Sequence, residues 1–412
     1  MNLAWRADFD AMWSELLPVG RHGQSGGYRR YAWTREDAVL REWFAAAASA
    51  HGLDVVTDRA GNQWAWWGDP DAATAAGRPG IVFGSHLDSV PDGGAYDGPL
   101  GVVSAFIALD RLRADGIVPT RPIGIVNFVD EEGARFGVAC GGSRLLTGAL
   151  DPDRARALTD SEGQSMAEAM SRLGHDPAGV GRDDETLRRV GAFVELHIEQ
   201  GRGLAETDHP VAVGSRIIPH GRWRIELDGE ANHAGTTRLD DRQDPMLDLA
   251  AVITATRFAA RTRRCVATVG KVQVEPNGVN SIPSRVTAWL DARGSAEEDV
   301  RGLADQVATA GGGRLVEESF TQATVFDPDL GAQVAGLLGD VPVLSTGAGH
   351  DAGILALAGV PTAMLFVRNP TGVSHSPAEH APRDDCHAGV ESLTQIALAL
   401  ACDGTEPVPA SF

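Results

Sequence analysis

The chain has 412 residues, more than one hydrophobic core usually organises, so two domains are expected. With 43% hydrophobic and 22% charged residues, its composition is that of an ordinary globular protein and disfavours disorder. The formal net charge of -20 repels phosphate backbones and anionic lipid surfaces, so neither a nucleic acid nor a membrane is expected as a partner.

The chain start and the cysteines indicate where the protein works. Charged residues interrupt residues 1–17, which therefore lack the apolar core of a secretory signal, and no apolar run reaches membrane-spanning length. The four cysteines are far apart and form no CxxC pair, which argues against a disulfide framework and a thiolate zinc site. We expect a cytoplasmic protein.

Apolar runs that end in polar residues alternate with helical patterns, which predicts an α/β fold with a mixed, mostly parallel sheet flanked by helices. Four runs are notable: 81–83 before His86, 123–129 before three acids, 192–196 before His197, and 362–367 leading towards His375. Ligands of open α/β sheets bind beyond the carboxyl ends of the strands, so one shared site is predicted. The Ala/Gly-rich stretch 71–80 is expected to be a loop.

The pattern changes between residues 214 and 326. Residues 222–228 alternate between polar and apolar, as in a strand with one exposed face, and further strands are expected at 271–274, 286–290 and 314–317. Helices are expected over 244–261 and from a capping box at Ser295 to about Ala310. The order β-α-β-β-α-β is typical of a ferredoxin-like α+β insert. We therefore predict a catalytic domain of residues 1–213 and 327–412, interrupted by a domain of residues 214–326.

The first polar residues after a predicted strand are His86 and Asp88. They are two apart and share a face if the strand continues, where a carboxylate can hold an imidazole for metal binding. Asp97 follows in a Gly-rich turn, where its carboxylate can approach an ion and bridge two. Taken alone, either segment is more typical of a core histidine or a solvated loop aspartate.

Three consecutive acids follow the second strand and change this balance. Asp130, Glu131 and Glu132 repel one another unless cations or protons neutralise them. Neighbouring side chains at a strand end point apart, so one glutamate can bind metal while the other acts as a base. An acidic loop in water is the alternative. His197 and His375 add nitrogen ligands, and imidazole with carboxylate suits Zn²⁺, Mn²⁺, Co²⁺ or Ni²⁺ better than Ca²⁺ or Mg²⁺.

Six motifs resemble a known family, the metal-dependent amidases that include allantoate amidohydrolase, N-carbamoyl-L-amino-acid hydrolase and β-ureidopropionase, within the wider clan of dinuclear-zinc aminoacylases and carboxypeptidases. The motifs are Gly-Ser-His-Leu-Asp-Ser-Val from Gly84, Asp-Glu-Glu-Gly-Ala-Arg-Phe from Asp130, His-Ile-Glu-Gln-Gly from His197, Asn-His-Ala-Gly-Thr-Thr from Asn232, Gly-Ala-Gly-His-Asp-Ala from Gly347 and His-Ser-Pro-Ala-Glu from His375. The wider clan tends to have a carboxylate where His197 stands, which favours the amidase branch.

The resemblance implies two divalent metal ions per subunit, Zn²⁺ or Mn²⁺, with Co²⁺ or Ni²⁺ as alternatives. Asp97 would bridge them, with His86 and His197 on one ion and Glu132 and His375 on the other. Glu131 would then be the general base. The spacing of His86 and Asp88, not the resemblance, is what predicts that Asp88 orients the His86 imidazole.

The resemblance also implies roles outside the metal ligands. His233 would stabilise the oxyanion from the inserted lid domain, in this family often from a partner subunit, which implies a homodimer formed through that domain. Gln200, Asn280 and Arg293 would bind the substrate. Apart from the resemblance, Gly347 begins a glycine-rich turn, so we expect its backbone to approach the substrate closely. His350 and Asp351 are expected to orient their glycine-rich turn rather than to bind metal.

The activity that the resemblance implies is hydrolysis of a linear amide or ureido C–N bond in a small carboxylic acid. Allantoate or an N-carbamoyl-L-amino acid is the first choice, with an N-formyl- or N-acyl-amino acid or a dipeptide as alternatives. A non-enzymatic binding protein is disfavoured because Glu131 is present. The chain departs from the family at Arg238, where proline is usual, and at Arg216 and His220 on the lid strand, where small apolar residues are usual. Such cationic donors favour a second substrate carboxylate or carbonyl.

Overall fold

The computed structural model describes residues 4–339 and 341–402. The chain divides into two compact units, a larger unit formed by Met1–Arg216 with Val325–Phe412 and a smaller unit formed by Ile217–Thr324. Among the described residues, none of the helices combines the length and the hydropathy needed to cross a bilayer.

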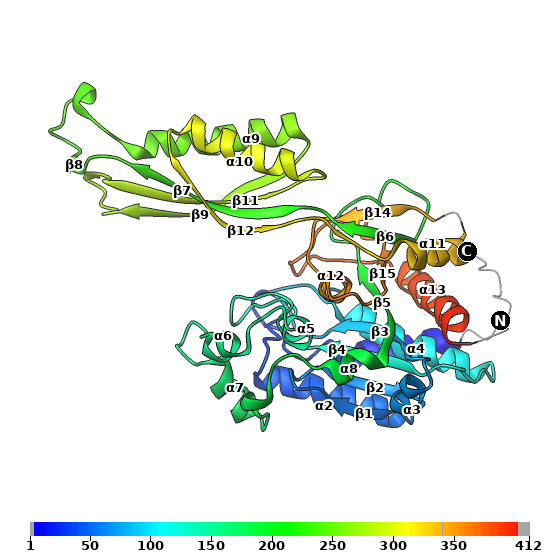
Figure 1. Ribbon diagram of the computed structural model, residues 1–412. Helices are drawn as coiled ribbons and strands as arrows, with labels where there is room; N and C mark the ends of the chain where they lie inside the picture. The colour runs from blue at the N-terminus through cyan, green and yellow to red at the C-terminus, as the bar shows by residue number, and fades with distance from the viewer. Residues whose placement is uncertain (1–3, 340, 403–412) are drawn as a thin grey trace. The chain divides into compact units, whose positions relative to one another are not determined.

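The larger unit is built on one mixed sheet with the strand order β1-β2-β4-β3-β5-β15-β6-β13, and β14 pairs with β6 (Figure 1). The strands are β1 (Asp54–Thr57), β2 (Gln63–Trp67), β3 (Gly80–His86), β4 (Ile123–Phe128), β5 (Val190–Ile198), β6 (Val211–Ile217), β13 (Thr324–Val325), β14 (Val343–Thr346) and β15 (Thr362–Val367). The neighbours β4, β3, β5 and β15 are parallel, whereas β2 and β6 join them antiparallel. The predicted α/β class with a mixed, helix-flanked sheet is confirmed.

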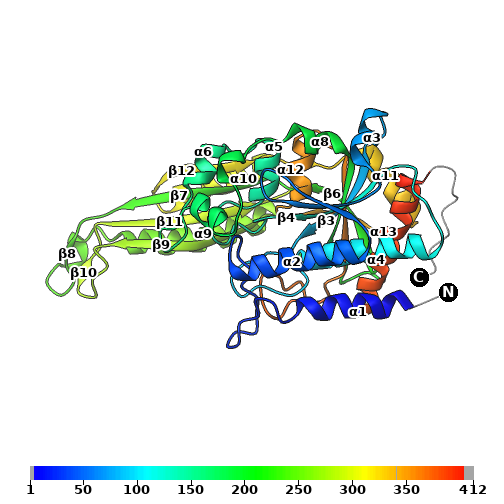
Figure 2. The same cartoon turned by 90° about the horizontal axis from the view of Figure 1, so that it is seen from below.

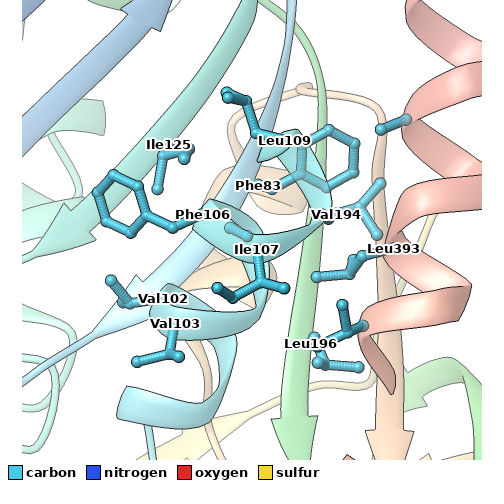
Figure 3. Packing of buried hydrophobic residues seen from close by; sticks show 14 of the residues in the cluster. Phe83, Val102, Val103, Phe106, Ile107, Leu109, Ile125, Val194, Leu196 and Leu393 are labelled. Carbon is cyan, nitrogen blue, oxygen red and sulfur yellow. The ribbon is translucent and has the colours of Figure 1, made fainter. Parts of the chain in front are cut away.

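One layer of helices packs on the sheet through the main hydrophobic core. It contains α1 (Ala4–Leu16), α2 (Arg35–Ala50), α4 (Pro99–Ala114), α11 (Pro328–Leu338) and α13 (Arg383–Ala401). Figure 2 shows α1 beside α4, and Phe44 of α2 packs against Phe106 of α4 with ring centres 5.5 Å apart. Helix α4 is apolar nearly all round because it lies between β3 and α13. In Figure 3 its residues Phe106 and Ile107 lie among Phe83, Val194 and Leu196 of the strands.

Short helices make up the rest of the larger unit: α3 (Pro70–Ala75), α5 (Gly141–Thr147), α6 (Pro152–Ala157), α7 (Met166–Arg172), η1 (Pro177–Gly179), α8 (Asp184–Arg189) and α12 (Asp351–Leu357). The prediction of a loop over residues 71–80 is therefore wrong for residues 71–75, which belong to α3. The Asp69 side chain accepts hydrogen bonds from the backbone N–H groups of Asp71 and Ala72, and Pro70 stands at the first helical position, so a helix begins there.

The smaller unit is a four-stranded antiparallel sheet with two helices on one face (Figure 1). The sheet order is β12-β7-β11-β9, and a separate pair, β8 with β10, extends from one end. In chain order the elements are β7 (His220–Asp228), β8 (Asn232–His233), η2 (Leu239–Asp241), α9 (Pro245–Arg263), β9 (Val266–Glu275), β10 (Ser281–Ile282), β11 (Arg285–Arg293), α10 (Glu297–Ala310) and β12 (Arg314–Thr321). Alternate residues of β7 and β11, such as Ile225 and Leu290, face the helices.

The capping box predicted at Ser295 is wrong. Ala296 occupies the cap position in an extended conformation, and no side chain accepts a hydrogen bond there. The first turn instead holds Glu297, Glu298 and Asp299, whose negative charges favour the positive end of the helix dipole. The start of α10 is therefore stabilised by charge rather than by a reciprocal cap.

Candidate metal centre

The polar residues predicted at the strand ends of the larger unit come together at one edge of its sheet. His86 is the last residue of β3, His197 lies near the end of β5, and Glu132 follows β4. Asp97 lies just before α4, and His375 lies in the loop after β15. Because β4, β3, β5 and β15 are adjacent and parallel, their carboxyl ends meet at the same edge.

Asp97 lies among three histidines. Its Oδ1 atom is 3.0 Å from Nε2 of His197 and 3.5 Å from Nε2 of His86. Its Oδ2 atom is 3.5 Å from Nε2 of His375. The next residue, Gly98, has a φ of 84°, and a Cβ there would lie 2.5 Å from the His86 ring. A residue other than glycine would push Asp97 away from the histidines.

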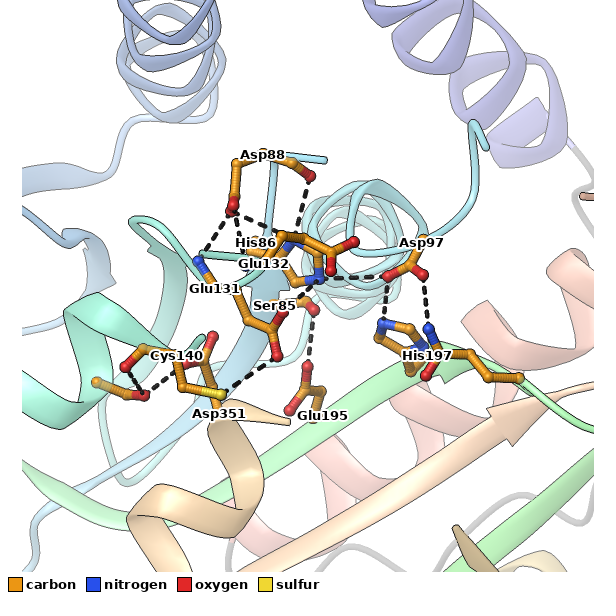
Figure 4. A network of polar contacts seen from close by, with 12 residues as sticks. Ser85, His86, Asp88, Asp97, Glu131, Glu132, Cys140, Glu195, His197 and Asp351 are labelled. Atoms are coloured by element: carbon orange, nitrogen blue, oxygen red, sulfur yellow. Dashed lines mark hydrogen bonds and ion pairs between the residues drawn. The ribbon is translucent and has the colours of Figure 1, made fainter. Parts of the chain in front are cut away.

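Asp88 holds the two glutamates (Figure 4). Its carboxylate accepts the backbone N–H of Glu131 at 3.1 Å and that of Glu132 at 3.0 Å. Its backbone carbonyl oxygen lies 3.2 Å from Nδ1 of His86, closer than its carboxylate at 3.4 Å. The side chains of the glutamates then diverge: Oε2 of Glu131 is 3.9 Å from Nε2 of His86, and Oε2 of Glu132 is 3.7 Å from Nε2 of His375.

Three groups of side chains have the composition of a metal site: one is Glu195, His197 and His350, and the other two share Asp97. His86, Asp97 and His197 each offer one ligand atom within 4.8 Å of the others, and so do Asp97, Glu132 and His375. Among the described residues, the buried Oε1 atom of Glu132 has no hydrogen-bond partner, and the Nε2 atoms of His86 and His197 lie near the Asp97 carboxylate without the geometry of a hydrogen bond. Buried polar atoms are rarely left so, and imidazole with carboxylate is the donor set of Zn²⁺ or Mn²⁺. The residues therefore fit divalent metal ions.

Burial and crowding perturb the protonation of these groups. Burial raises the pKa of Glu132 to about 7 and raises the pKa of Glu131 well above its usual range. Burial alone would lower the pKa of His197, but the Asp97 carboxylate reverses this and raises it to about 9. Burial acts to raise the pKa of Asp97, yet the neighbouring imidazoles hold it well below its usual range. A bound cation would displace protons from such a cluster.

Two of the predicted substrate-binding residues belong to the larger unit. Gln200 donates from Nε2 to Oδ2 of Asp97 at 2.7 Å, and the same atom lies 3.2 Å from Nε2 of His375. Gly347 lies in the turn between β14 and α12. His350 at the end of that turn is buried, with its ring centre 4.6 Å from that of His197, so the turn lies beside the candidate site.

The predicted residues of the smaller unit lie towards opposite ends of its sheet. His233 on β8 is paired with Ser281 of β10, and Ala234 donates its N–H to the Asn280 carbonyl oxygen at 3.0 Å. Arg293 is the last residue of β11 and stands directly opposite His220 of β7. Arg293 also donates from Nε to Oδ1 of Asp291 at 2.9 Å.

Sequence reasoning missed three polar residues around the centre. Glu195 on β5 accepts hydrogen bonds from Ser85 Oγ at 2.7 Å and from the Ala352 N–H at 3.0 Å, and its only signal was an acid inside an apolar run. Glu379 accepts the backbone N–H of Asp97 at 3.2 Å, and it stands in the motif that begins at His375. Cys140 donates from Sγ to Oε1 of Glu131 at 3.4 Å, with no signal in the sequence.

Comparison with known proteins adds to this geometry. The model of peptidase family M20/M25/M40 matches residues 82–399. An N-carbamoyl-L-amino acid amidohydrolase from Geobacillus stearothermophilus is 37% identical over 95% of this chain and 98% of its own length. Allantoate amidohydrolase from Escherichia coli K12 is 30% identical over 92% of this chain and 94% of its own length.

A solved structure shows the same likeness. The crystal structure of an amidase of the hydantoinase/carbamoylase family from Burkholderia multivorans matches with a TM-score of 0.84 and 28% identity, over 98% of each chain. The resemblance predicted from the six motifs is therefore confirmed. The chain belongs to peptidase family M20/M25/M40.

Proposed function

We propose that the protein hydrolyses a linear ureido or amide C–N bond in a small carboxylic acid, with allantoate or an N-carbamoyl-L-amino acid as first candidates. The observation that carries this proposal is the Asp97 carboxylate shared by two groups of metal-ligand type, with Glu131 beside them. The relatives from G. stearothermophilus and E. coli are named for these two reactions. N-formyl- and N-acyl-amino acids and dipeptides are the alternative substrates.

Two divalent ions, Zn²⁺ or Mn²⁺ with Co²⁺ or Ni²⁺ as alternatives, would be held by Asp97 and the four residues grouped with it. His86, Asp97 and His197 would hold one ion, and Asp97, Glu132 and His375 the other. When bound, such ions polarise a carbonyl and lower the pKa of water.

Glu131 is the residue that we assign to proton transfer. It is buried, and one of its oxygens faces the His86 side of the cluster. Burial raises its pKa well above the usual range, so the carboxylate accepts a proton readily. As the water oxygen bonds to the carbonyl carbon, Glu131 would take the water proton. As the C–N bond breaks, it would give that proton to the leaving nitrogen.

His233 has the tautomer that an oxyanion donor needs. Its Nδ1 atom accepts the backbone N–H of Gly235 at 3.0 Å, so the neutral ring carries its proton on Nε2. His233 is exposed, and its Nε2–H would stabilise the negative oxygen of the tetrahedral intermediate. Asn280 and Arg293 would bind the substrate carboxylate, with Arg293 offering a fork of donors.

The geometry of the smaller unit supports a homodimer. From Arg285 to Arg293, β11 spans eight steps, which in an extended strand is roughly 26 Å. His233 and Asn280 lie beyond the Arg285 end, so one copy of this unit cannot bring His233 and Arg293 to the same small molecule. We propose that a second copy of the chain supplies both His233 and Asn280, and that Arg293 comes from the copy whose metal-ligand residues bind the substrate.

The outer face of α9 supports the same assembly. Met246, Leu247, Ile253 and Phe258 recur at helical spacing and are exposed, Phe258 by 64% of its surface. The adjoining β9 is an edge strand of the sheet and exposes Val272. An apolar helix face next to an unpaired strand edge is typical of a contact between two copies of one chain.

We propose that the protein works in the cytoplasm. Cys140, Cys265, Cys386 and Cys402 are all free thiols. Free thiols persist in the reducing conditions of that compartment.

A substrate panel with purified protein tests the proposed function. Metal content is measured first, and the protein is then loaded with Mn²⁺ or Zn²⁺. Ammonia or carbamate release is followed with allantoate and N-carbamoyl-L-amino acids, and in parallel with N-formyl-, N-acetyl-amino acids and dipeptides. We expect turnover of a ureido acid. Turnover of dipeptides or N-acetyl substrates alone would transfer the assignment to a peptidase or aminoacylase, and turnover of none would refute it.

A further inference from the structure

The side chain of Cys140 contacts the residue that we assign as the general base. Its Sγ atom is 3.4 Å from Oε1 of Glu131, and its backbone N–H donates to the Glu131 carbonyl oxygen at 2.5 Å. Cys140 precedes α5 and is only 3% exposed. Figure 4 shows the thiol reaching Glu131 from the side opposite His86. Glu131 therefore has one oxygen against the thiol and the other facing His86.

The backbone conformation at Cys140 is one that glycine adopts more easily than cysteine does. Its φ of 55° and ψ of 39° lie in the left-handed region, where a Cβ is unfavourable. Cysteine gains no helix-capping hydrogen bond in return, because no side-chain cap is present at this helix start. A side chain kept at a position that disfavours one indicates that the thiol itself has a use.

The thiol is held in its donor form. Burial raises the pKa of Cys140 well above its usual range, and the nearby carboxylates of Glu131 and Asp351 act in the same direction. The proton therefore stays on the sulfur, where it can be donated to a carboxylate oxygen.

We propose that the Cys140 thiol positions the Glu131 carboxylate by donating its S–H to Oε1, which turns Oε2 towards the metal-ligand groups. This inference rests on the proposed function, which makes Glu131 the base. Cys140 acts through Glu131 and does not contact the reacting atoms, so it is a positioning residue. A small misplacement of a catalytic group can cost about a hundredfold in rate, so even a weak donor can matter here.

Infrared spectroscopy tests the contact without any substrate. The S–H stretching band of Cys140 is assigned by its loss in Cys140→Ala. Because the thiol donates to a carboxylate, we expect this band to shift to higher frequency in Glu131→Ala. The band of Cys386, a buried thiol on α13, serves as the control and should stay in place. A Cys140 band that does not respond to Glu131→Ala would overturn the inference.

Kinetics test the positioning role. In the metal-loaded enzyme, we expect Cys140→Ala and Cys140→Gly to lower kcat by about tenfold to a hundredfold while KM stays the same. Cys140→Ser keeps a donor and should restore a large part of kcat, and Cys386→Ala should match the wild type. Glycine relieves the left-handed backbone, so Cys140→Gly should unfold at a temperature equal to or above that of Cys140→Ala.

The possible results separate this inference from the proposed function. If kcat of Cys140→Ala and Cys140→Gly equals that of the wild type, the positioning role is wrong even if the infrared contact exists. If the wild type turns over no substrate in the panel, the proposed function fails, and the infrared comparison still decides whether the thiol holds Glu131.

Discussion

Replacing Glu131 by glutamine separates proton transfer from metal binding, because the amide keeps the shape of the side chain and cannot act as a base. Glu131 belongs to neither of the two groups around Asp97 that could hold metal. Glu131 approaches these groups through its Oε2 atom, which lies 3.9 Å from Nε2 of His86. We therefore expect Glu131→Gln to bind metal as the wild type does and to lose turnover.

The size of the loss follows from the assigned role of Glu131. A positioned general base contributes about 10² to 10⁴ in rate, which corresponds to about 3 to 5 kcal/mol of activation free energy. The metal-free fold should not weaken, because burial and the nearby acids Asp351, Glu132 and Asp88 penalise the charged form of Glu131 and outweigh the opposing effect of His86. The neutral amide escapes that penalty, so the free energy of unfolding at neutral pH should equal or exceed that of the wild type.

Ammonia release at saturating substrate, with metal content measured on the same samples, checks this prediction. Glu132→Gln is the matched control. It makes the same substitution at the next residue, but it removes a carboxylate oxygen from one of the two groups that could hold metal. That variant should lose metal and activity together. Full activity in Glu131→Gln, or a loss of metal as large as in Glu132→Gln, would refute the assignment of the base.

Three further predictions concern pH, assembly and substrate choice. Burial raises the pKa of Glu132 from 4.5 to about 7, so the folded, metal-free protein holds a proton that the unfolded chain releases, and this part of its stability should be lost as pH rises between these values. Mn²⁺ affinity should increase over the same pH range, because Mn²⁺ binding displaces that proton. Thermal unfolding with and without Mn²⁺ measures both trends. If the contribution of Glu132 to the stability of the metal-free protein increased with pH, the predicted loss of stability would be contradicted. Phe258→Glu on α9 should give monomers by light scattering with little activity. Mixing inactive His233→Ala and Arg293→Ala chains should recover up to about a quarter of wild-type activity, since half of the dimers are mixed and one of their two sites is intact; no recovery after subunit exchange would argue against a shared site. His220 stands opposite Arg293, so it could contact a second substrate carboxylate, such as that of N-carbamoyl-L-aspartate. His220→Ala should raise KM by about tenfold for that substrate and little for N-carbamoyl-L-alanine. Equal effects on both substrates in initial-rate assays would exclude a role of His220 in binding the second carboxylate.

The sequence predicted the parallel strands well because they are buried on both faces. β3, β4 and β15 are buried along their whole length, so each contains an apolar run that stands out from its surroundings. A polar residue directly after such a run lies at the carboxyl edge of the sheet, which is why His86 and Glu132 could be expected to share a site.

Contacts between distant parts of the chain could not be predicted in this way. Ser85 and Glu195 form a hydrogen bond although 110 positions separate them. The thiol of Cys140 reaches Glu131 because the loop after β4 folds back onto itself, and no periodic pattern marks such a turn. The capping prediction for α10 was wrong for a related reason. Ser295 matched a capping motif, but acidic residues in the first turn stabilise the helix start instead.

Glu195 and Glu132, two acids of the larger unit, differ in whether the fold satisfies their oxygens, and this difference favours different roles for the two. Glu195 lies within β5, and both of its oxygens accept hydrogen bonds, from Ser85 and Ala352. Glu132 is also largely buried, but its Oε1 atom has no partner among the described residues and its Oε2 atom faces His375. An unsatisfied buried carboxylate destabilises the folded state, so a chain retains one where a ligand offsets the cost. The fold therefore satisfies Glu195 by itself, whereas we propose that a bound cation offsets the burial of Glu132.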